Sequence, residues 1–150
     1  MSDEAFQKGL EIVARVLVAS PKARRAVKLK PDEDADYLLE DMVTNQPVRL
    51  VNVIGYSWPL ARTNTVFGWA DKIDKLSEMA RRKGNLPASL ICYWDDEHWG
   101  VVNVPSQFEM EWAKRPHKNN GRLIYAIPLK DFSILMKYAG KSNEKVTAAD

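Results

Sequence analysis

A cysteine, a histidine and three acids lie close together in residues 89–104, SLICYWDDEHWGVVNV. Cys92, His98 and a neighbouring aspartate are the residue types of a nucleophile, a base and an orienting acid. In a hairpin that pairs Trp94 with Trp99, however, Cys92 and His98 lie ~10 Å apart, whereas a nucleophile and its base must approach within roughly 3 Å. We therefore expect no thiol chemistry and predict that Cys92 is a small buried apolar residue.

Acidic residues at two places could instead hold a divalent metal ion, because carboxylate oxygens attract hard cations. At the hairpin tip, residues 95–97 are also of the types that favour a solvated turn, which is the interpretation we favour. A second acidic block, residues 32–41, is interpreted as the exposed start of a helix, with Glu40 and Asp41 kept as possible ligands near a strand end. The prediction is no catalytic residue, no metal site and no cofactor. The nuclease alternative would use Glu40, Asp41 and Asp95 with Mg²⁺.

Basic residues are sorted into blocks, although the formal net charge of the chain is only +2. One acid-free block covers residues 22–30, and a second basic block covers residues 114–122. Basic groups at helix ends and in loops can reach phosphates without disturbing a core. For the cluster at residues 81–83, a favourable interaction with a helix C-terminus is the alternative explanation. The predicted nucleic-acid contacts are Arg62, Arg81, Arg82, Trp112, Lys114, Arg115, Lys118 and Arg122.

The tryptophans raise a separate question, because an exposed indole can stack on an unpaired base. Only Trp58 and Trp112 fall in predicted loops, and the others are assigned to the core or to the hairpin. Trp112 precedes two basic residues, so base stacking is one reading and a loop residue folded onto the core is the other. Trp58 and Trp112 could also form a protein-binding surface, because tryptophan is enriched at interface hot spots.

Hydrophobic periodicity and turn residues indicate the elements that carry these side chains. The clearest helix covers residues 66–83, with Val66, Ile73 and Leu76 on one face and Gly84 after its end. The expected elements are a helix over 3–19, one or two helical turns to residue 27, a helix over 34–43, a strand over 48–55, a loop over 56–64, the helix over 66–83, a hairpin over 89–104, a turn of helix near 108–112, a strand over 122–129 and a helix over 131–139.

Length and composition restrict the class of protein. A chain of 150 residues, of which 45% are hydrophobic, can bury one continuous core, so we expect a single globular domain over residues 1–140 and a disordered tail over 141–150. No apolar run approaches the roughly 20 residues of a membrane span, and the acids near the N-terminus are unlike a signal peptide. We therefore expect a soluble cytoplasmic protein. A single cysteine excludes an internal disulfide, and with two histidines it falls short of a structural zinc site.

The order of elements, ααβαβββα, predicts an α+β fold, or an α/β sandwich, around a small mixed four-stranded sheet with helices on both faces. The strand at 48–55, the helix at 66–83 and the next strand form a right-handed parallel crossover, and the hairpin adds an antiparallel member. Both faces of the hairpin are apolar in the register set by Trp94 and Trp99. This is typical of a sheet that is buried on both sides.

The motifs from residue 48 onward follow a recognisable succession. VNVIGYSWPLARTN is followed by VFGWADKIDKLSEMARRKGN, by SLICYWDD and by EWAKRPHKNNGRLIYAIPLKDF. This succession resembles the RecU-type Holliday-junction resolvases, in which a catalytic strand leads through a Ser/Pro-Leu loop to a helix, a strand pair and a late Gly-Arg strand. The matching positions are Ser57, Pro59, Leu60, Gly121 and Arg122. The resemblance implies a restriction-endonuclease-like fold and an association with nucleic acid.

The same resemblance implies a magnesium site that the residues here do not match. Nucleases of this fold carry an acidic residue and then Glu-x-Lys on the next strand, which hold magnesium and activate water. The corresponding strand reads Val51, Asn52, Val53 and contains neither an acid nor a lysine. We therefore predict a nucleic-acid-associated protein that binds DNA or RNA rather than cleaving it. The alternatives are a protein-interaction or inhibitor module that uses Trp58 and Trp112, and a metal-dependent nuclease with displaced carboxylates.

Overall fold

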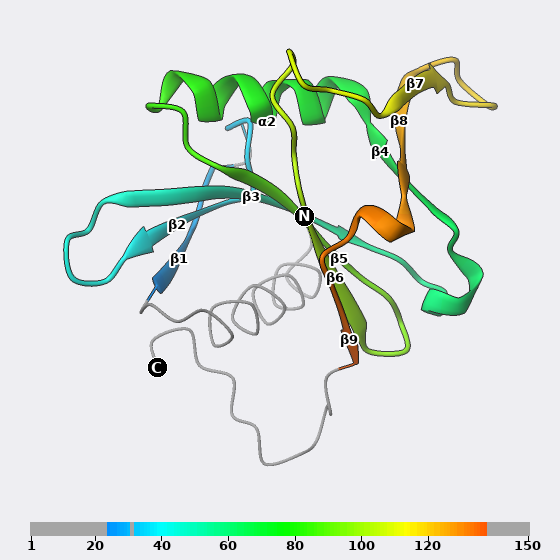
Figure 1. Cartoon of the computed structure of the whole chain (residues 1–150), viewed down its shortest axis with the longest axis horizontal. Coiled ribbons are helices and arrows are strands. Elements are labelled where there is room, and N and C mark those ends of the chain that lie inside the picture. Colours follow the sequence, from blue (N-terminus) through cyan, green and yellow to red (C-terminus); the bar gives the residue numbers. More distant parts are fainter. Residues whose placement is uncertain (1–23, 31, 138–150) are drawn as a thin grey trace.

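The computed structural model describes residues 24–30 and 32–137, which form two β-sheets and one long helix (Figure 1). The larger sheet contains six strands, in the spatial order β1 (Arg24–Lys28), β2 (Tyr37–Asp41), β3 (Pro47–Gly55), β5 (Ala88–Tyr93), β6 (His98–Asn103) and β9 (Ile134–Lys137). The smaller sheet contains three strands, in the order β4 (Thr65–Trp69), β8 (Leu123–Pro128) and β7 (Ala113–Pro116). The helices among these residues are α2 (Ala70–Arg82) and the short 3₁₀ turns η1 (Leu60–Arg62) and η2 (Leu129–Asp131).

The centre of the larger sheet is the parallel pair β3 and β5, in which Val53 lies beside Ile91. The other neighbours in this sheet are antiparallel. The chain crosses from β3 to β5 through β4 and α2, so the predicted parallel crossover and the antiparallel hairpin are confirmed. The α+β class is confirmed as well. In the described part of the chain the larger sheet nevertheless has six strands instead of four, and the sequence pattern does not predict the second sheet.

Helix α2 lies across one face of the six-stranded sheet. The smaller sheet lies at the N-terminal end of α2 (Figure 1). Ile73, Leu76 and Met79 point from one side of the helix into the core. Burying each of these side chains stabilises the fold by about 1.5–3 kcal/mol. In the described part of the chain, no helix combines the length and the apolar composition needed to cross a membrane.

Residues 65–69 form β4 rather than the first turn of the predicted helix. Val66 and Gly68 are buried while Phe67 between them is 42% exposed, which is the alternation of a strand. Gly68 also permits a close approach of the helix, because a Cβ atom there would lie 2.7 Å from Ile73 Cδ1. The helix therefore begins only after β4, and it ends within a residue of the predicted position.

The helix predicted over residues 34–43 is wrong, because this segment contains β2. Tyr37 and Leu39 pack on one face of the larger sheet, and Leu38 packs against the core cluster on the other face. A short apolar run of this kind does not distinguish a strand buried on both faces from a buried helix. Pairing with β1 on one side and β3 on the other decides in favour of the strand.

Four other helical predictions are also corrected or lie outside the described residues. The described part of the expected helical turns before residue 28 is β1, and residues 131–137 contain the end of η2 and then β9. Residues 108–112 form no helical turn. The helix expected over residues 3–19 and the tail expected over 141–150 are outside the described residues.

The hairpin of β5 and β6 has a register that differs by one residue from the prediction. Trp99 pairs with Tyr93, whereas the predicted partner of Trp99 is Trp94. The shift arises at the tip, where Glu97 adopts a positive φ of 72° and closes a three-residue loop. Because a shift of one residue turns a strand over, Trp94 and Trp99 lie in core clusters on opposite faces. Burial of β5 on both faces is confirmed.

Candidate nucleic-acid interface

A groove of about 940 Å³ opens between the segment that joins β3 to β4 and the smaller sheet. Its walls include aromatic and basic side chains, and none of its described lining residues is a carboxylate. The lining residues are Tyr56, Trp58, Arg62, Thr63, Thr65, Phe67, Arg115, Pro116, His117, Lys118, Asn119 and Ile124. A groove of this composition can contact a planar ring and an anion at the same time.

Aromatic residues from two elements form the apolar part of the groove. Trp58 and Phe67 are 39% and 42% exposed, whereas Tyr56 is half-buried, with its ring centroid 4.9 Å from that of Trp58. The indole Nε1–H of Trp58 donates to Thr63 Oγ1 at 3.2 Å. The same hydroxyl oxygen accepts a 2.8 Å hydrogen bond from the buried indole of Trp94. Thr63 therefore fixes the orientation of Trp58 at the groove.

The turn between β5 and β6 supports the loop that carries Trp58. Asp95 N–H donates to the Trp58 carbonyl oxygen at 3.3 Å, and Leu60 N–H donates to Asp96 Oδ1 at 3.4 Å. Asp96 Oδ2 also lies 2.9 Å from His98 Nδ1. Burial raises the pKa of Asp96, but the contacts with His98 and Leu60 N–H lower it more, so the net shift is downward. The acids at the hairpin tip thus form a structural turn.

Three of the predicted phosphate contacts line this groove, namely Arg62, Arg115 and Lys118. All three side chains are exposed, and none forms an ion pair with a carboxylate among the described residues. The Arg115 guanidinium lies 4.9 Å from the centroid of the Phe67 ring, within the range of a cation–π interaction. The groove therefore carries positive charge that the described part of the protein does not neutralise.

The turn between β7 and β8 places Lys118 at the groove. His117 N–H donates to the Arg122 carbonyl oxygen at 2.7 Å and closes the turn. Arg122 N–H donates to Asn120 Oδ1 at 2.9 Å, and Gly121 has a φ of 72°, which residues with a Cβ atom rarely adopt. The Gly-Arg pair of the sequence resemblance therefore ends this turn and leads into β8.

The remaining predicted cations form ion pairs within the protein. These pairs are Arg81 with Glu78, Arg82 with Asp34, Lys114 with Asp74 and Arg122 with Asp71. The Arg122 guanidinium donates to both carboxylate oxygens of Asp71, at 2.9 and 3.1 Å, and lies 4.0 Å from the centroid of the Trp69 ring. The hydrogen bonds from Arg122 hold the pKa of Asp71 below its usual value. Arg122 and Lys114 thus join the smaller sheet to α2.

Trp112 packs against the core instead of lining the groove. It is half-buried, and its ring meets that of Tyr125 edge-on with 6.3 Å between the centroids. Its Nε1–H donates to Asp131 Oδ2 at 3.2 Å. Tyr125 Oη–H donates to Asp74 Oδ1 at 2.6 Å, and burial together with this carboxylate raises the pKa of Tyr125. This geometry corresponds to a loop tryptophan folded onto the core.

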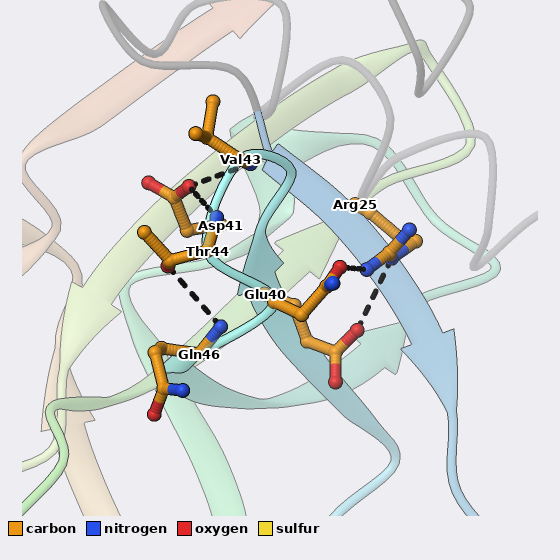
Figure 2. Close-up of polar contacts among 7 residues, drawn as sticks. Arg25, Glu40, Asp41, Val43, Thr44 and Gln46 are labelled. Carbon is orange, nitrogen blue, oxygen red and sulfur yellow. Dashed lines mark hydrogen bonds and ion pairs between the residues drawn. The ribbon is translucent and has the colours of Figure 1, made fainter.

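Glu40 and Asp41, two of the possible nuclease carboxylates, are engaged near the turn between β2 and β3 (Figure 2). Arg25 Nε–H donates to Glu40 Oε1 at 3.1 Å. Asp41 Oδ1 accepts hydrogen bonds from the N–H groups of Val43 and Thr44 at 2.8 and 3.0 Å, as an aspartate does at the start of a turn. Both carboxylates therefore have structural partners.

The third possible carboxylate, Asp95, belongs to the other end of the sheet. Glu40 lies opposite Pro47 at the start of β3, whereas Tyr93 lies beside Gly55 at the end of β3. The strand between these points has 9 residues and, at ~3.3 Å per residue, spans roughly 30 Å. Among the described residues, no group of three His, Cys, Asp or Glu side chains could hold a metal ion. The structure therefore does not bring the predicted carboxylates together.

Asp36, immediately before β2, lies beside Asn52 on the next strand. This is the relation that the resemblance implies for the acidic residue and the glutamate of Glu-x-Lys. Asp36 N–H lies 2.8 Å from Asn52 Oδ1, and Asp36 Oδ2 accepts a 2.9 Å hydrogen bond from Val53 N–H. The adjoining pocket of about 260 Å³ is lined by acids but also by Lys72 and Lys75. With an amide in place of the second carboxylate and Asp36 already engaged, these residues do not fit a magnesium centre.

The helical interpretation of residues 66–83 conceals the role of Phe67, which faces the groove from β4. The signal that could have identified it is the composition of residues 65–69, Thr-Val-Phe-Gly-Trp, because β-branched and aromatic residues favour a strand. Asp36 is missed for a similar reason, since it lies between the buried Ala35 and Tyr37. Cys92 is fully buried, as predicted, and burial raises the pKa of its thiol.

A solved structure shares this fold. Hjc, a Holliday junction resolvase from the archaeal hyperthermophile Archaeoglobus fulgidus, is similar to this chain with a TM-score of 0.52 and 15% sequence identity, over 89% of this chain and 93% of that one. No protein-family model and no curated protein sequence matches the chain. A likeness at this identity concerns the fold alone. At that level it confirms the predicted resemblance to Holliday-junction resolvases and the restriction-endonuclease-like architecture.

Proposed function

We propose that this protein binds nucleic acid, with DNA as the first candidate, through the groove between Trp58 and Arg115. The observation that carries the proposal is the set of exposed cations in a groove that has exposed aromatic rings and no described carboxylate. Cations of this kind attract phosphates and release counterions when they bind. DNA is favoured over RNA because the fold is similar to that of a Holliday junction resolvase.

We also propose that binding is not followed by cleavage. The support is the pairing of Asp36 with Asn52, because Asn52 supplies a neutral amide at the position where a second carboxylate would stand, and Asp36 Oδ2 accepts a hydrogen bond from Val53 N–H. Metal-assisted cleavage needs convergent carboxylates that hold the ion and position a water molecule. Incubation of linear and branched DNA with magnesium or manganese should therefore yield no products, and cleavage that is lost in Asp36→Ala would overturn this part of the proposal.

The binding proposal is tested by neutralising the groove. A triple variant with Arg62, Arg115 and Lys118 changed to alanine should bind labelled duplex and four-way-junction DNA much more weakly in fluorescence anisotropy. Because each phosphate contact contributes about 0.9 to the slope of log K against log salt, the slope should become shallower by up to about 2.7.

The matched control removes the same charge from exposed positions on or just after α2. Lys72, Lys75 and Lys83 are exposed and lie outside the groove, so their triple alanine variant changes the net charge equally. It should retain most of the affinity and most of the salt slope. Equal losses in the two triple variants would show that net charge, and not the groove, determines binding. Absence of any DNA retardation at low salt would overturn the proposal altogether.

A further inference from the structure

We infer that the groove receives an unpaired nucleobase, which stacks on Trp58 or Phe67 while the neighbouring cations contact the flanking phosphates. The inference rests on the proposed function and specifies the form of its ligand, which is a single strand or a duplex with a displaced base. The supporting observation is that aromatic side chains are exposed in the groove, because phosphate binding alone does not require them.

The first argument is the exposure of two large rings at one site. Trp58 comes from the loop after β3 and Phe67 from β4, and both line the same groove with more than a third of their surface exposed. Every base has a π-face that can stack on an aromatic ring, whatever its sequence. In a paired duplex these faces are covered by neighbouring bases. Only an unpaired base can therefore use the two rings.

The second argument is that Trp58 is oriented before any ligand arrives. Its indole is tied to Thr63, and its ring is in contact with Tyr56, which itself stacks on the buried Trp94 with an interplanar angle of 18°. A side chain that is already fixed loses little rotamer freedom on binding. The stacking surface is therefore preorganised, unlike a solvent-exposed residue such as Phe108, which is 97% exposed.

The third argument concerns size and charge. A volume of about 940 Å³ is at the upper end of the roughly 300–1,000 Å³ typical of ligand sites and accommodates a base with its sugar and phosphates. Arg62, Arg115 and Lys118 supply the positive charge that those phosphates require. A basic or neutral peptide would gain nothing from these cations, and an acidic peptide would not need the exposed rings.

The experiment compares three labelled probes of equal length by fluorescence anisotropy: single-stranded oligothymidylate, a fully paired duplex, and a single strand whose central nucleotides are abasic. We expect the single strand to bind more tightly than the duplex. Stacking contributes enough per base that Trp58→Ala and Phe67→Ala should each weaken single-strand binding by roughly 5- to 150-fold. The abasic strand should bind weakly and respond little to either variant, and Phe108→Ala should change nothing.

The outcomes separate the inference from the proposed function. If duplex, single strand and abasic strand bind equally and only the triple charge variant loses affinity, the groove binds phosphate and the stacking inference is wrong. If no probe binds, the proposed function fails too. If Trp58→Ala lowers the melting temperature, Phe67→Ala decides, because Phe67 is an exposed strand residue. Competition by polyglutamate as strong as by the single strand would indicate a general anion site and would also overturn the inference.

Discussion

The aromatic groove and the pocket around Asp36 both contain charged side chains, but the charges have different partners. In the groove, Arg62, Arg115 and Lys118 have no carboxylate partner among the described residues. In the pocket, the Asp36 carboxylate accepts Val53 N–H and thereby extends the contact between the start of β2 and β3. A charged side chain that has no partner within the described part of the protein is available to a ligand. A charged side chain that has such a partner contributes to stability. Variants in the two regions should therefore separate binding from stability.

The largest expected effect on stability is at Asp36. Asp36→Ala removes the acceptor of Val53 N–H just before the start of β2 and should lower the free energy of unfolding by about 1.5–3 kcal/mol, as for hydrogen bonds to charged groups. Urea denaturation measures this loss. DNA affinity, measured on the folded variant, should remain unchanged.

Asp32→Ala is the matched control, because Asp32 is exposed in the same pocket and its carboxylate forms no hydrogen bond or ion pair with the described residues. It should leave stability nearly unchanged. A loss of DNA affinity in Asp36→Ala without a loss of stability would contradict the distinction between the two regions and would return Asp36 to the ligand-binding site.

A slightly smaller effect on stability, combined with an effect on binding, is expected at Thr63. Thr63→Val keeps the shape of the side chain but removes the acceptor of two indole N–H groups, one of which belongs to the fully buried Trp94. An unsatisfied buried donor costs about 1–3 kcal/mol. Because Trp58 also loses its anchor, single-strand binding should weaken together with stability.

Thr63→Ser separates these effects from a change in packing, because it keeps the hydroxyl and removes only a methyl group. It should retain most of the binding. If Thr63→Val loses stability but binds DNA as well as the native protein, the orientation of Trp58 is not important for the groove.

The same two regions show how far the sequence predicts the structure. Arg62, Arg115 and Lys118 are recognisable as available cations because they belong to loop or edge segments. Arg122 and Lys114 look equally available in the sequence, but their partners Asp71 and Asp74 are 51 and 40 positions away along the chain. These carboxylates are distant in the sequence and reach the cations only because the smaller sheet packs against α2. A local sequence pattern does not predict this packing.

Errors in the predicted elements have a similar physical origin. Residues 37–39, Tyr-Leu-Leu, are buried in a strand that has neighbours on both sides, and an apolar run alone leaves strand and helix equally possible. In the hairpin, Glu97 adopts a positive φ without being glycine, so the one-residue shift of register has no clear signal in the sequence. The strand at Pro47–Gly55 is predicted well, because its β-branched residues follow a clear turn signal at Asn45.

The smallest expected effect concerns the ion pair that occupies Arg122. Asp71→Asn weakens an exposed pair and should lower the free energy of unfolding by only a few tenths of a kcal/mol at about pH 7. The pKa of Asp71 is lowered in the folded protein, so its contribution to stability is present above the unfolded-state pKa and is lost as the pH falls through the folded-state pKa. Native protein and variant should therefore converge in stability once the pH has fallen below the folded-state pKa of Asp71.

Denaturation curves at neutral and acidic pH measure the difference in stability between the native protein and Asp71→Asn. If the difference persists in acid, it arises from packing and not from charge. The same variant also tests the comparison between Arg115 and Arg122, which both belong to the β7–β8 hairpin. It releases Arg122 from its carboxylate but leaves Arg115 and the groove unchanged. A gain in DNA affinity as large as the loss caused by Arg115→Ala would place Arg122 among the ligand contacts, and a negligible gain would confine those contacts to the groove.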